Sequence, residues 1–186
     1  VVRQDDTGHT TVGVAFGAMA PVDSTAQDAA RDTASTAPRE HPVVNEYGLN
    51  QKYTFETFIV GKTTDLAHAA CQAVAQAVVD RKQKPYNPLF IYGGVGLGKT
   101  HLLQAVGNRV CQGIPGARIR YVTCEQFMRD FIATVRGGEG KDFHDRYRTV
   151  DLLLIDDIQF ISGKEGTQEA FFHTFNHLHQ NEKQVV

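Results

Sequence analysis

Hydrophobic and polar positions divide this chain of 186 residues into two unequal parts. In the first part, residues 1–46, the stretch Pro21–Pro42 is small, polar and acidic-leaning, with almost no large apolar residue. Such a segment cannot bury enough surface to offset the entropy lost when its backbone is ordered. The pattern predicts a flexible linker over 1–46, in which the more apolar His9–Ala18 could be ordered, and a folded domain over 47–186.

Strand-like and helix-like patterns alternate through the second part. Short apolar or alternating runs predict strands, and apolar positions at helical spacing predict helices. The predicted strands are Leu89–Tyr92, Ala117–Thr123, Val150–Asp157 and a fourth that begins at Gln184. The predicted helices are Thr63–Asp80, His101–Val110, Glu125–Val135, Lys141–Tyr147 and Gly166–Gln180. This order is typical of an α/β fold, a parallel sheet flanked by helices.

Composition narrows the class of protein only a little. The formal net charge is −2, so any contact with nucleic acid needs a local basic patch. Three cysteines without a C-x-x-C pair indicate free thiols in a reducing compartment. No run of eighteen apolar residues and no signal peptide is present, so we expect no membrane span. The chain starts at Val1 and stops at Val186 within an apolar run, and we expect a piece of a longer protein.

Four glycines crowd the junction between the first predicted strand and the following helix. The stretch GGVGLGKT fits the pattern G-x-x-x-x-G-K-[ST], in the strand-then-helix context that this motif requires. Glycines let backbone N–H groups curl around a polyphosphate, and the helix N-terminus favours negative charge. The alternative is a glycine-rich turn that only lets a helix pack. The predicted nucleotide-binding residues are Gly93, Gly94, Val95, Gly96, Leu97, Gly98, Lys99, Thr100 and His101.

Two carboxylates end the most apolar predicted strand. Asp156 and Asp157 follow LLLI, and ligands of open α/β sheets bind at the carboxyl ends of the strands. We predict that Lys99 reaches the β- and γ-phosphates, and that Thr100 and Asp156 hold Mg²⁺. Asp157 is placed to orient or deprotonate the attacking water, so Lys99, Asp156 and Asp157 are the predicted catalytic residues. The alternative is an acidic strand end that caps the next helix.

Two other clusters suggest weaker hypotheses. His173 and His177 have the spacing of metal ligands, but nothing nearby completes a site, so a packing role is preferred. The charged stretch Lys141–Arg148 is interpreted as a solvated helix face, with a phosphate or subunit contact through Arg146 or Arg148 as the alternative.

The sequences NPLFIYGGVGLGKTHLLQAVGN and VDLLLIDDIQFISGKEGTQEAFFHTFNHLH closely resemble the AAA+ ATPase domain of the DnaA family of bacterial replication initiators. The resemblance covers Leu49–Val186, and the series IDDIQF, GKE and FFHTFN is more specific than the glycine motif. It implies a P-loop NTPase sheet that is incomplete at its C-terminus, with the fourth strand between the first and the third. The lid and the DNA-binding domain are expected to lie outside the chain.

The resemblance also assigns roles to residues. Gly93–Thr100 would be the Walker A loop, and Asp156 and Asp157 the Walker B pair, with Asp157 where many AAA+ proteins carry Glu. Residues 53–60 would line the adenine pocket, and the helices within Glu125–Tyr147 would be the insertion that marks initiators.

Single-stranded DNA contacts are implied at two further positions, Ile132 and Lys164. Family members often carry a basic side chain where this chain has Gly166 and His144, and both departures weaken the DNA-contact interpretation.

The implied function is an ATP-switched initiator that binds and helps to unwind the replication origin as an ATP-bound oligomer. ATP and Mg²⁺ are the implied cofactors, and hydrolysis is weak and resets the switch. The implied partners are duplex origin DNA through the absent C-terminal domain, single-stranded DNA, further copies of the chain, the replicative helicase and, as a candidate, acidic phospholipids. The implied location is the bacterial cytoplasm, at the nucleoid.

Two alternatives remain, a helicase loader and a DnaA-related regulator without the duplex-binding domain. An eroded regulator would tolerate loss of Lys99, Thr100 or Asp156, and all three are intact. Because the family's sensor and arginine finger follow the last residue, we expect this chain to bind ATP weakly and to show no useful turnover.

Overall fold

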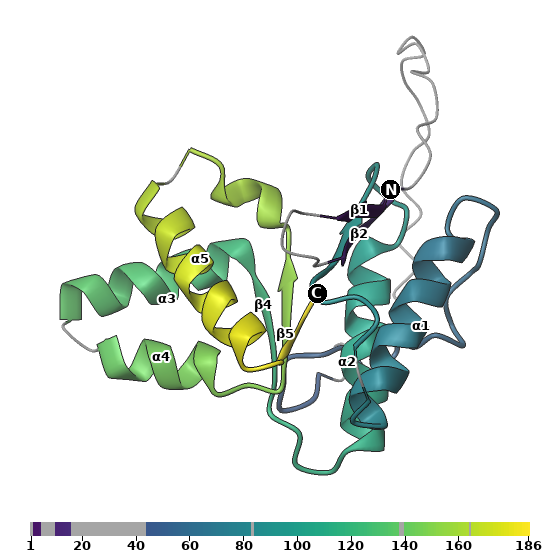
Figure 1. The fold of residues 1–186 in the computed structure, drawn as a ribbon, viewed down its shortest axis with the longest axis horizontal. Coiled ribbons are helices and arrows are strands. Elements are labelled where there is room, and N and C mark those ends of the chain that lie inside the picture. The colour runs from purple at the N-terminus through teal and green to yellow at the C-terminus, as the bar shows by residue number, and fades with distance from the viewer. Residues whose placement is uncertain (1, 5–9, 16–43, 83, 138–139, 164) are drawn as a thin grey trace, which may run out of the picture.

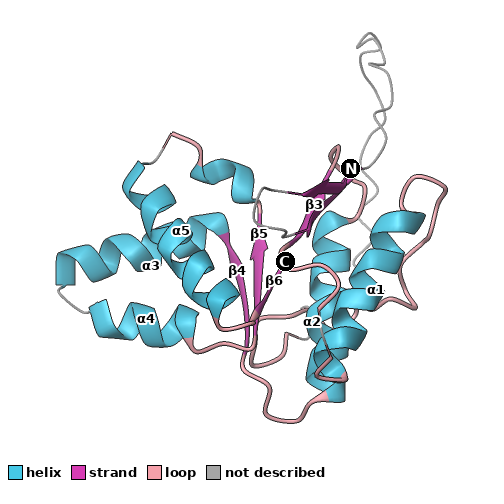
Figure 2. Ribbon diagram, in the orientation of Figure 1, coloured by secondary structure: helices cyan, strands magenta, loops and turns pink. Residues whose placement is uncertain are grey.

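A computed structural model of the chain describes residues 2–4, 10–15, 44–82, 84–137, 140–163 and 165–186. The strands are β1 (Val2–Gln4), β2 (Thr10–Ala15), β3 (Leu89–Tyr92), β4 (Ile119–Thr123), β5 (Leu152–Asp156) and β6 (Gln184–Val185). The helices are α1 (Asp65–Val79), α2 (Lys99–Gly113), α3 (Cys124–Gly137), α4 (Gly140–Arg148), the short 3₁₀ helix η1 (Ile158–Ile161) and α5 (Glu165–Gln180). From residue 65 onward strands and helices alternate, so the predicted α/β fold is confirmed (Figures 1 and 2).

Strand β5 lies at the centre of the structure, between two groups of helices. It pairs in parallel with β4 on one side and with β6 on the other. Leu152 and Leu154 belong to the apolar core shared with α1 and α2, whereas Leu153 belongs to the core shared with α3, α4 and α5. Because successive side chains of a strand point to opposite faces, a continuous leucine run serves both cores. Figure 1 shows α1 and α2 on one side and α3, α4 and α5 on the other.

The side chain of Asn87 joins β6 to the segment that leads into β3. Its Nδ2 donates to the Lys183 carbonyl at 2.7 Å, and its Oδ1 accepts from the Val185 N–H at 3.1 Å. The neighbouring backbone groups of Gln184 and Val186 face β5 instead. Strand β6 therefore pairs with β5 through its backbone and contacts the segment before β3 through the Asn87 side chain. The described strands form two three-stranded sheets, β1-β2-β3 and β4-β5-β6, so the expected single sheet with the fourth strand paired to the first is not formed among them.

Strands β1 and β2 lie within the segment predicted to be a linker. Strand β2 runs parallel to β3, with Val12 opposite Leu89 and Ala15 opposite Tyr92, and β1 pairs antiparallel with β2. The edge of β3 offers unpaired N–H and C=O groups that an added strand can satisfy. Residues 10–15 lie within His9–Ala18, the stretch that could be ordered, whereas no strand was predicted at residues 2–4. The other residues from 1 to 43 lie outside the described residues.

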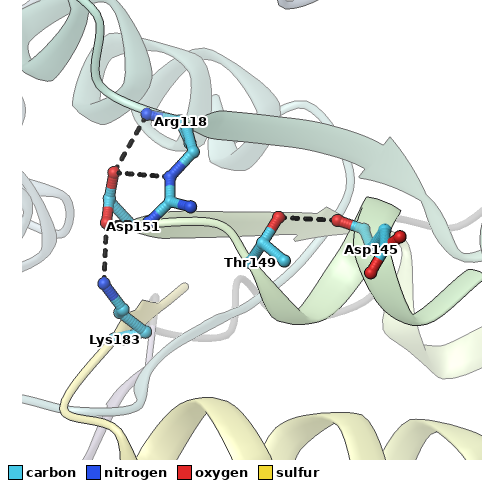
Figure 3. A network of polar contacts seen from close by, with 5 residues as sticks. All are labelled: Arg118, Asp145, Thr149, Asp151 and Lys183. Atoms are coloured by element: carbon cyan, nitrogen blue, oxygen red, sulfur yellow. Dashed lines mark hydrogen bonds and ion pairs between the residues drawn. The ribbon is translucent and has the colours of Figure 1, made fainter.

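Asp151 holds the amino-terminal ends of β4, β5 and β6 together, at the opposite end of β5 from Asp156 (Figure 3). Its carboxylate accepts from Lys183 Nζ at 2.7 Å and from the Arg118 N–H at 3.1 Å, and it pairs with the Arg118 guanidinium. Close by, the Thr149 hydroxyl donates to the backbone carbonyl of Asp145 at 2.6 Å.

Among the described residues, no helix combines the length and apolar character that a bilayer span requires.

Candidate nucleotide-binding site

The glycine loop connects β3 to α2, and two of its glycines have a left-handed backbone conformation. Gly96 and Gly98 have φ angles of 79° and 81°, a region that residues with a side chain rarely adopt. Val95, the first non-glycine residue of the loop, is fully exposed. Gly98 is also the N-cap of α2, and a β-carbon there would lie 2.6 Å from Cε2 of Phe58. The loop therefore needs glycine at this point both for its backbone angle and for the ring packed against it.

Lys99, Thr100 and His101 form the first turn of α2, which begins two residues before the predicted helix His101–Val110. The Lys99 ammonium turns back over the loop, where it donates to the carbonyls of Gly93 at 3.1 Å and Gly94 at 2.7 Å. A cation is thus held above a glycine loop and beside the N–H groups of a helix N-terminus. That combination of donors suits a polyphosphate.

An aromatic cluster joins the loop helix to the lead-in segment, by which we mean Tyr47–Gly61. The His101 ring stacks on Tyr53 at 4.8 Å between centroids and meets the Phe58 ring edge-on at 5.2 Å. His101 Nε2 lies 2.8 Å from the carbonyl oxygen of Thr54. The lead-in segment is therefore fixed beside the glycine loop, and flat rings line this side of the site.

The two aspartates have different surroundings. Asp156, the last residue of β5, is only 9% exposed, and its Oδ1 accepts from the Asp157 N–H at 3.0 Å. Its Oδ2 accepts from the Tyr121 hydroxyl at 3.2 Å. Asp157 is exposed, has a left-handed φ of 57°, and accepts from Gln159 Nε2 at 3.1 Å. The structure thus gives a buried, oriented carboxylate followed by an exposed one, which differs from a plain helix-capping pair.

Tyr121 and Gln104 are site neighbours that the sequence analysis did not single out. Tyr121 lies on β4, and burial together with the charge of Asp156 raises the pKa of its hydroxyl to about 12. The sequence placed Tyr121 in a predicted strand, but it could not show which strand lies beside β5. Only the parallel pairing of β4 with β5 brings the hydroxyl to Asp156.

Of the two predicted DNA-contact residues, Ile132 is among the described residues. Ile132 is on α3 and is 45% exposed, whereas Lys164 and the side chain of His144 lie outside the described residues. A β-carbon at Gly166, in the first turn of α5, would be 4.0 Å from Cε1 of Phe131. The start of α5 therefore lies beside the part of α3 that carries Ile132.

Two of the weaker candidates, His173 and Arg146, have ordinary partners. His173 Nε2 lies 3.6 Å from Glu169 Oε1, one helical turn away. Arg146 NH1 lies 3.2 Å from Asp130 Oδ2, so this arginine pairs with α3. In the described part of the chain, no group of three His, Cys, Asp or Glu side chains is arranged to hold a metal ion.

A left-handed glycine loop, a lysine held over it, and a carboxylate at the end of the central parallel strand define a P-loop nucleotide-binding domain. The sequence profile of the bacterial DnaA ATPase domain matches residues 49–186. The chain therefore belongs to the DnaA family.

Individual relatives agree with this assignment. The chain is 54% identical over 150 residues to the chromosomal replication initiator protein DnaA of Deinococcus deserti, a match that covers 81% of this chain and 32% of that protein. The crystal structure of domain III of Thermotoga maritima DnaA superimposes with a TM-score of 0.70 at 50% identity, covering 74% of this chain and 56% of that one. The chain thus spans about a third of the length of the curated relative.

Two further solved structures carry ligands. AMPPCP-bound DnaA of Aquifex aeolicus superimposes with a TM-score of 0.65 at 46% identity, and it covers 74% of this chain and 41% of that one. A replication initiator DnaA bound to AMPPCP and single-stranded DNA gives a TM-score of 0.67 at the same identity and coverages. An ATP analogue is thus bound by relatives of this fold.

Proposed function

We propose that this chain is the nucleotide-binding part of an ATP-switched initiator of chromosomal replication. The observation that carries the proposal is the position of Lys99, held over a glycine loop beside the central strand that ends in Asp156. Membership of the DnaA family and the AMPPCP-bound relative support ATP as the ligand. The loop N–H groups from Gly93 to Thr100 and the ammonium of Lys99 bind the phosphates.

Mg²⁺ fits the oxygen donors of this site. The Thr100 hydroxyl and the Asp156 carboxylate are the hard ligands that Mg²⁺ prefers, and Asp156 is already oriented by two hydrogen bonds. When bound, the ion neutralises charge on the phosphates. The exposed Asp157 orients the attacking water, and the resulting weak ATPase activity resets the switch.

The DNA and protein partners are proposed at the level of the whole initiator. A relative bound to single-stranded DNA supports a contact of the same kind through Ile132 and Lys164. Duplex origin DNA would bind outside residues 47–186, which we assign to the ATP-binding domain, with 1–46, apart from the strands β1 and β2, as the linker before it. Further proposed partners are other ATP-bound copies of the chain, the replicative helicase and acidic phospholipids, in the bacterial cytoplasm at the nucleoid.

The test of the nucleotide site is a comparison of Lys99→Ala with Lys82→Ala. Both variants lose one ammonium, but Lys82 pairs with the exposed Asp80 outside the loop. We expect Lys99→Ala to weaken binding of a fluorescent ATP analogue by about tenfold or more, since one charge-assisted contact of ~1.4 kcal/mol is lost. Lys82→Ala should bind like the wild type. Equal binding by all three proteins would reject the site.

A further inference from the structure

Two polar side chains in the core, Gln104 and Tyr121, bond to the lead-in segment and to Asp156, respectively. Gln104 lies on α2 and is 6% exposed, and Tyr121 is half-buried on β4. Neither belongs to the glycine loop or to the carboxylate pair. Burial of a polar group costs free energy unless the group is hydrogen-bonded, so the partners of these two side chains show what they are used for.

Two hydrogen bonds show what these side chains are used for. The N–H of Asn50 donates to Gln104 Oε1 at 2.8 Å, so this amide is anchored to the lead-in segment. The Tyr121 hydroxyl donates to Asp156 Oδ2 at 3.2 Å, so it serves the carboxylate.

Two hydrogen bonds fix the Asp156 carboxylate. One oxygen is held by the Asp157 N–H and the other by Tyr121, so the plane of the carboxylate is set before any ligand binds. Each oxygen keeps a further lone pair, because a carboxylate has about four acceptor positions.

We propose that Tyr121 is a positioning residue for the metal-side carboxylate of Asp156. The inference rests on the proposed function, because Mg²⁺ binding at Asp156 belongs to that proposal. Groups that hydrogen-bond a metal-ligating carboxylate commonly change metal affinity when they are removed. A role in packing alone would instead affect stability without affecting the response to Mg²⁺.

The test uses the 186-residue chain with Tyr121→Phe, which removes the hydroxyl and keeps the ring. Binding of a fluorescent ATP analogue is titrated with Mg²⁺, and binding in EDTA and the thermal unfolding midpoint are recorded in parallel. We expect the Mg²⁺ concentration at half-maximal effect to rise about tenfold, as for other groups that support a metal ligand. Binding in EDTA should stay unchanged, because the glycine loop and Lys99 are untouched.

Tyr147→Phe is the matched control. It also removes a tyrosine hydroxyl bonded to an aspartate, here Asp130 Oδ2 at 2.6 Å between α4 and α3. We expect it to lower the unfolding midpoint and to leave the Mg²⁺ titration at its wild-type position. An unchanged titration for Tyr121→Phe, or an equal shift in both variants, would overturn the inference.

A second variant keeps the test decisive if Tyr121→Phe does not fold. Tyr121→Leu also removes the hydroxyl that donates to Asp156. It should shift the Mg²⁺ titration in the same direction, and a wild-type titration would reject the inference. If the wild type itself binds the analogue but shows no Mg²⁺ dependence, the proposed metal site fails, and this result is distinct from a failure of Tyr121→Phe alone.

Discussion

Gly107 of α2 lies directly against Leu154 of β5. A β-carbon at Gly107 would be 2.8 Å from Cδ1 of Leu154 and 2.8 Å from Cδ1 of Leu49, closer than real β-carbons approach. Both leucines are completely buried, so neither can move aside into solvent. This close approach brings the helix that begins with Lys99 onto the strand that ends in Asp156. The distance between the two halves of the nucleotide site therefore depends on the absence of a side chain at Gly107.

Gly107→Ala should consequently destabilise the chain, although alanine is the better helix former. We expect a loss of about 1–3 kcal/mol in the free energy of unfolding, the usual range for an overpacked core. Gly166→Ala in α5 is the control, because its β-carbon would make only an ordinary contact at 4.0 Å. Urea unfolding measures both variants, and an equally stable Gly107→Ala protein would disprove the tight contact.

Gly98→Ala and Gly96→Ala should differ in their effect on ATP binding. Both positions have positive φ angles, so each variant carries backbone strain of about 1 kcal/mol. Only at Gly98 would the added carbon also meet Phe58, whereas nothing lies within 4 Å of a β-carbon at Gly96. We expect the weaker ATP binding for Gly98→Ala, measured as the dissociation constant of a fluorescent analogue. Weaker binding by Gly96→Ala than by Gly98→Ala would show that the Phe58 ring does not restrict the loop.

Asp151 should make stability depend on pH below the physiological range. Burial raises the pKa of this carboxyl, but hydrogen bonds from Lys183 and Arg118 outweigh burial and lower the value to about 2. An aspartate of the unfolded chain titrates near ~3.9, so the stabilisation is complete above that pH and is lost as the pH falls towards 2. The side chain is 35% exposed, and solvent screening reduces the effect to about 1 kcal/mol.

Asp151→Asn tests this assignment. The variant should be less stable than the wild type at pH 7, and the difference in free energy of unfolding should shrink between pH 4 and pH 2. Urea unfolding at each pH measures this difference. Asp145→Asn is the control, since Asp145 takes part in the same region through its backbone carbonyl. A difference between Asp151→Asn and the wild type that does not change with pH would contradict the charge-based role.

Local patterns predicted much of this fold and the centre of the site. The apolar run before Asp156, the glycines before Lys99 and the helical spacing after them are all local features, and each appears where it was expected. The pairing of β2 with β3 was not predicted, because it joins residues about 77 positions apart and depends on the open edge of β3 rather than on the sequence of β2.

The Tyr121 partner of Asp156 was missed for a related reason. Tyr121 comes from a strand whose place beside β5 is set by tertiary packing. The left-handed backbone of Asp157 likewise has no local signal, since aspartate is common in ordinary turns as well. Sequence therefore predicted the residues proposed to carry the chemistry, and the structure adds a neighbour that sequence could not place beside them.

The central proposal is that Lys99 and Asp156 belong to one Mg²⁺-dependent ATP site. The decisive measurement is the dissociation constant of ATP for the wild type and for Asp156→Asn, each in Mg²⁺ and in EDTA. We predict that Mg²⁺ tightens binding to the wild type by about tenfold or more and has little effect on Asp156→Asn, because the variant lacks the carboxylate that supports the ion. The same Mg²⁺ effect in both proteins would contradict the account.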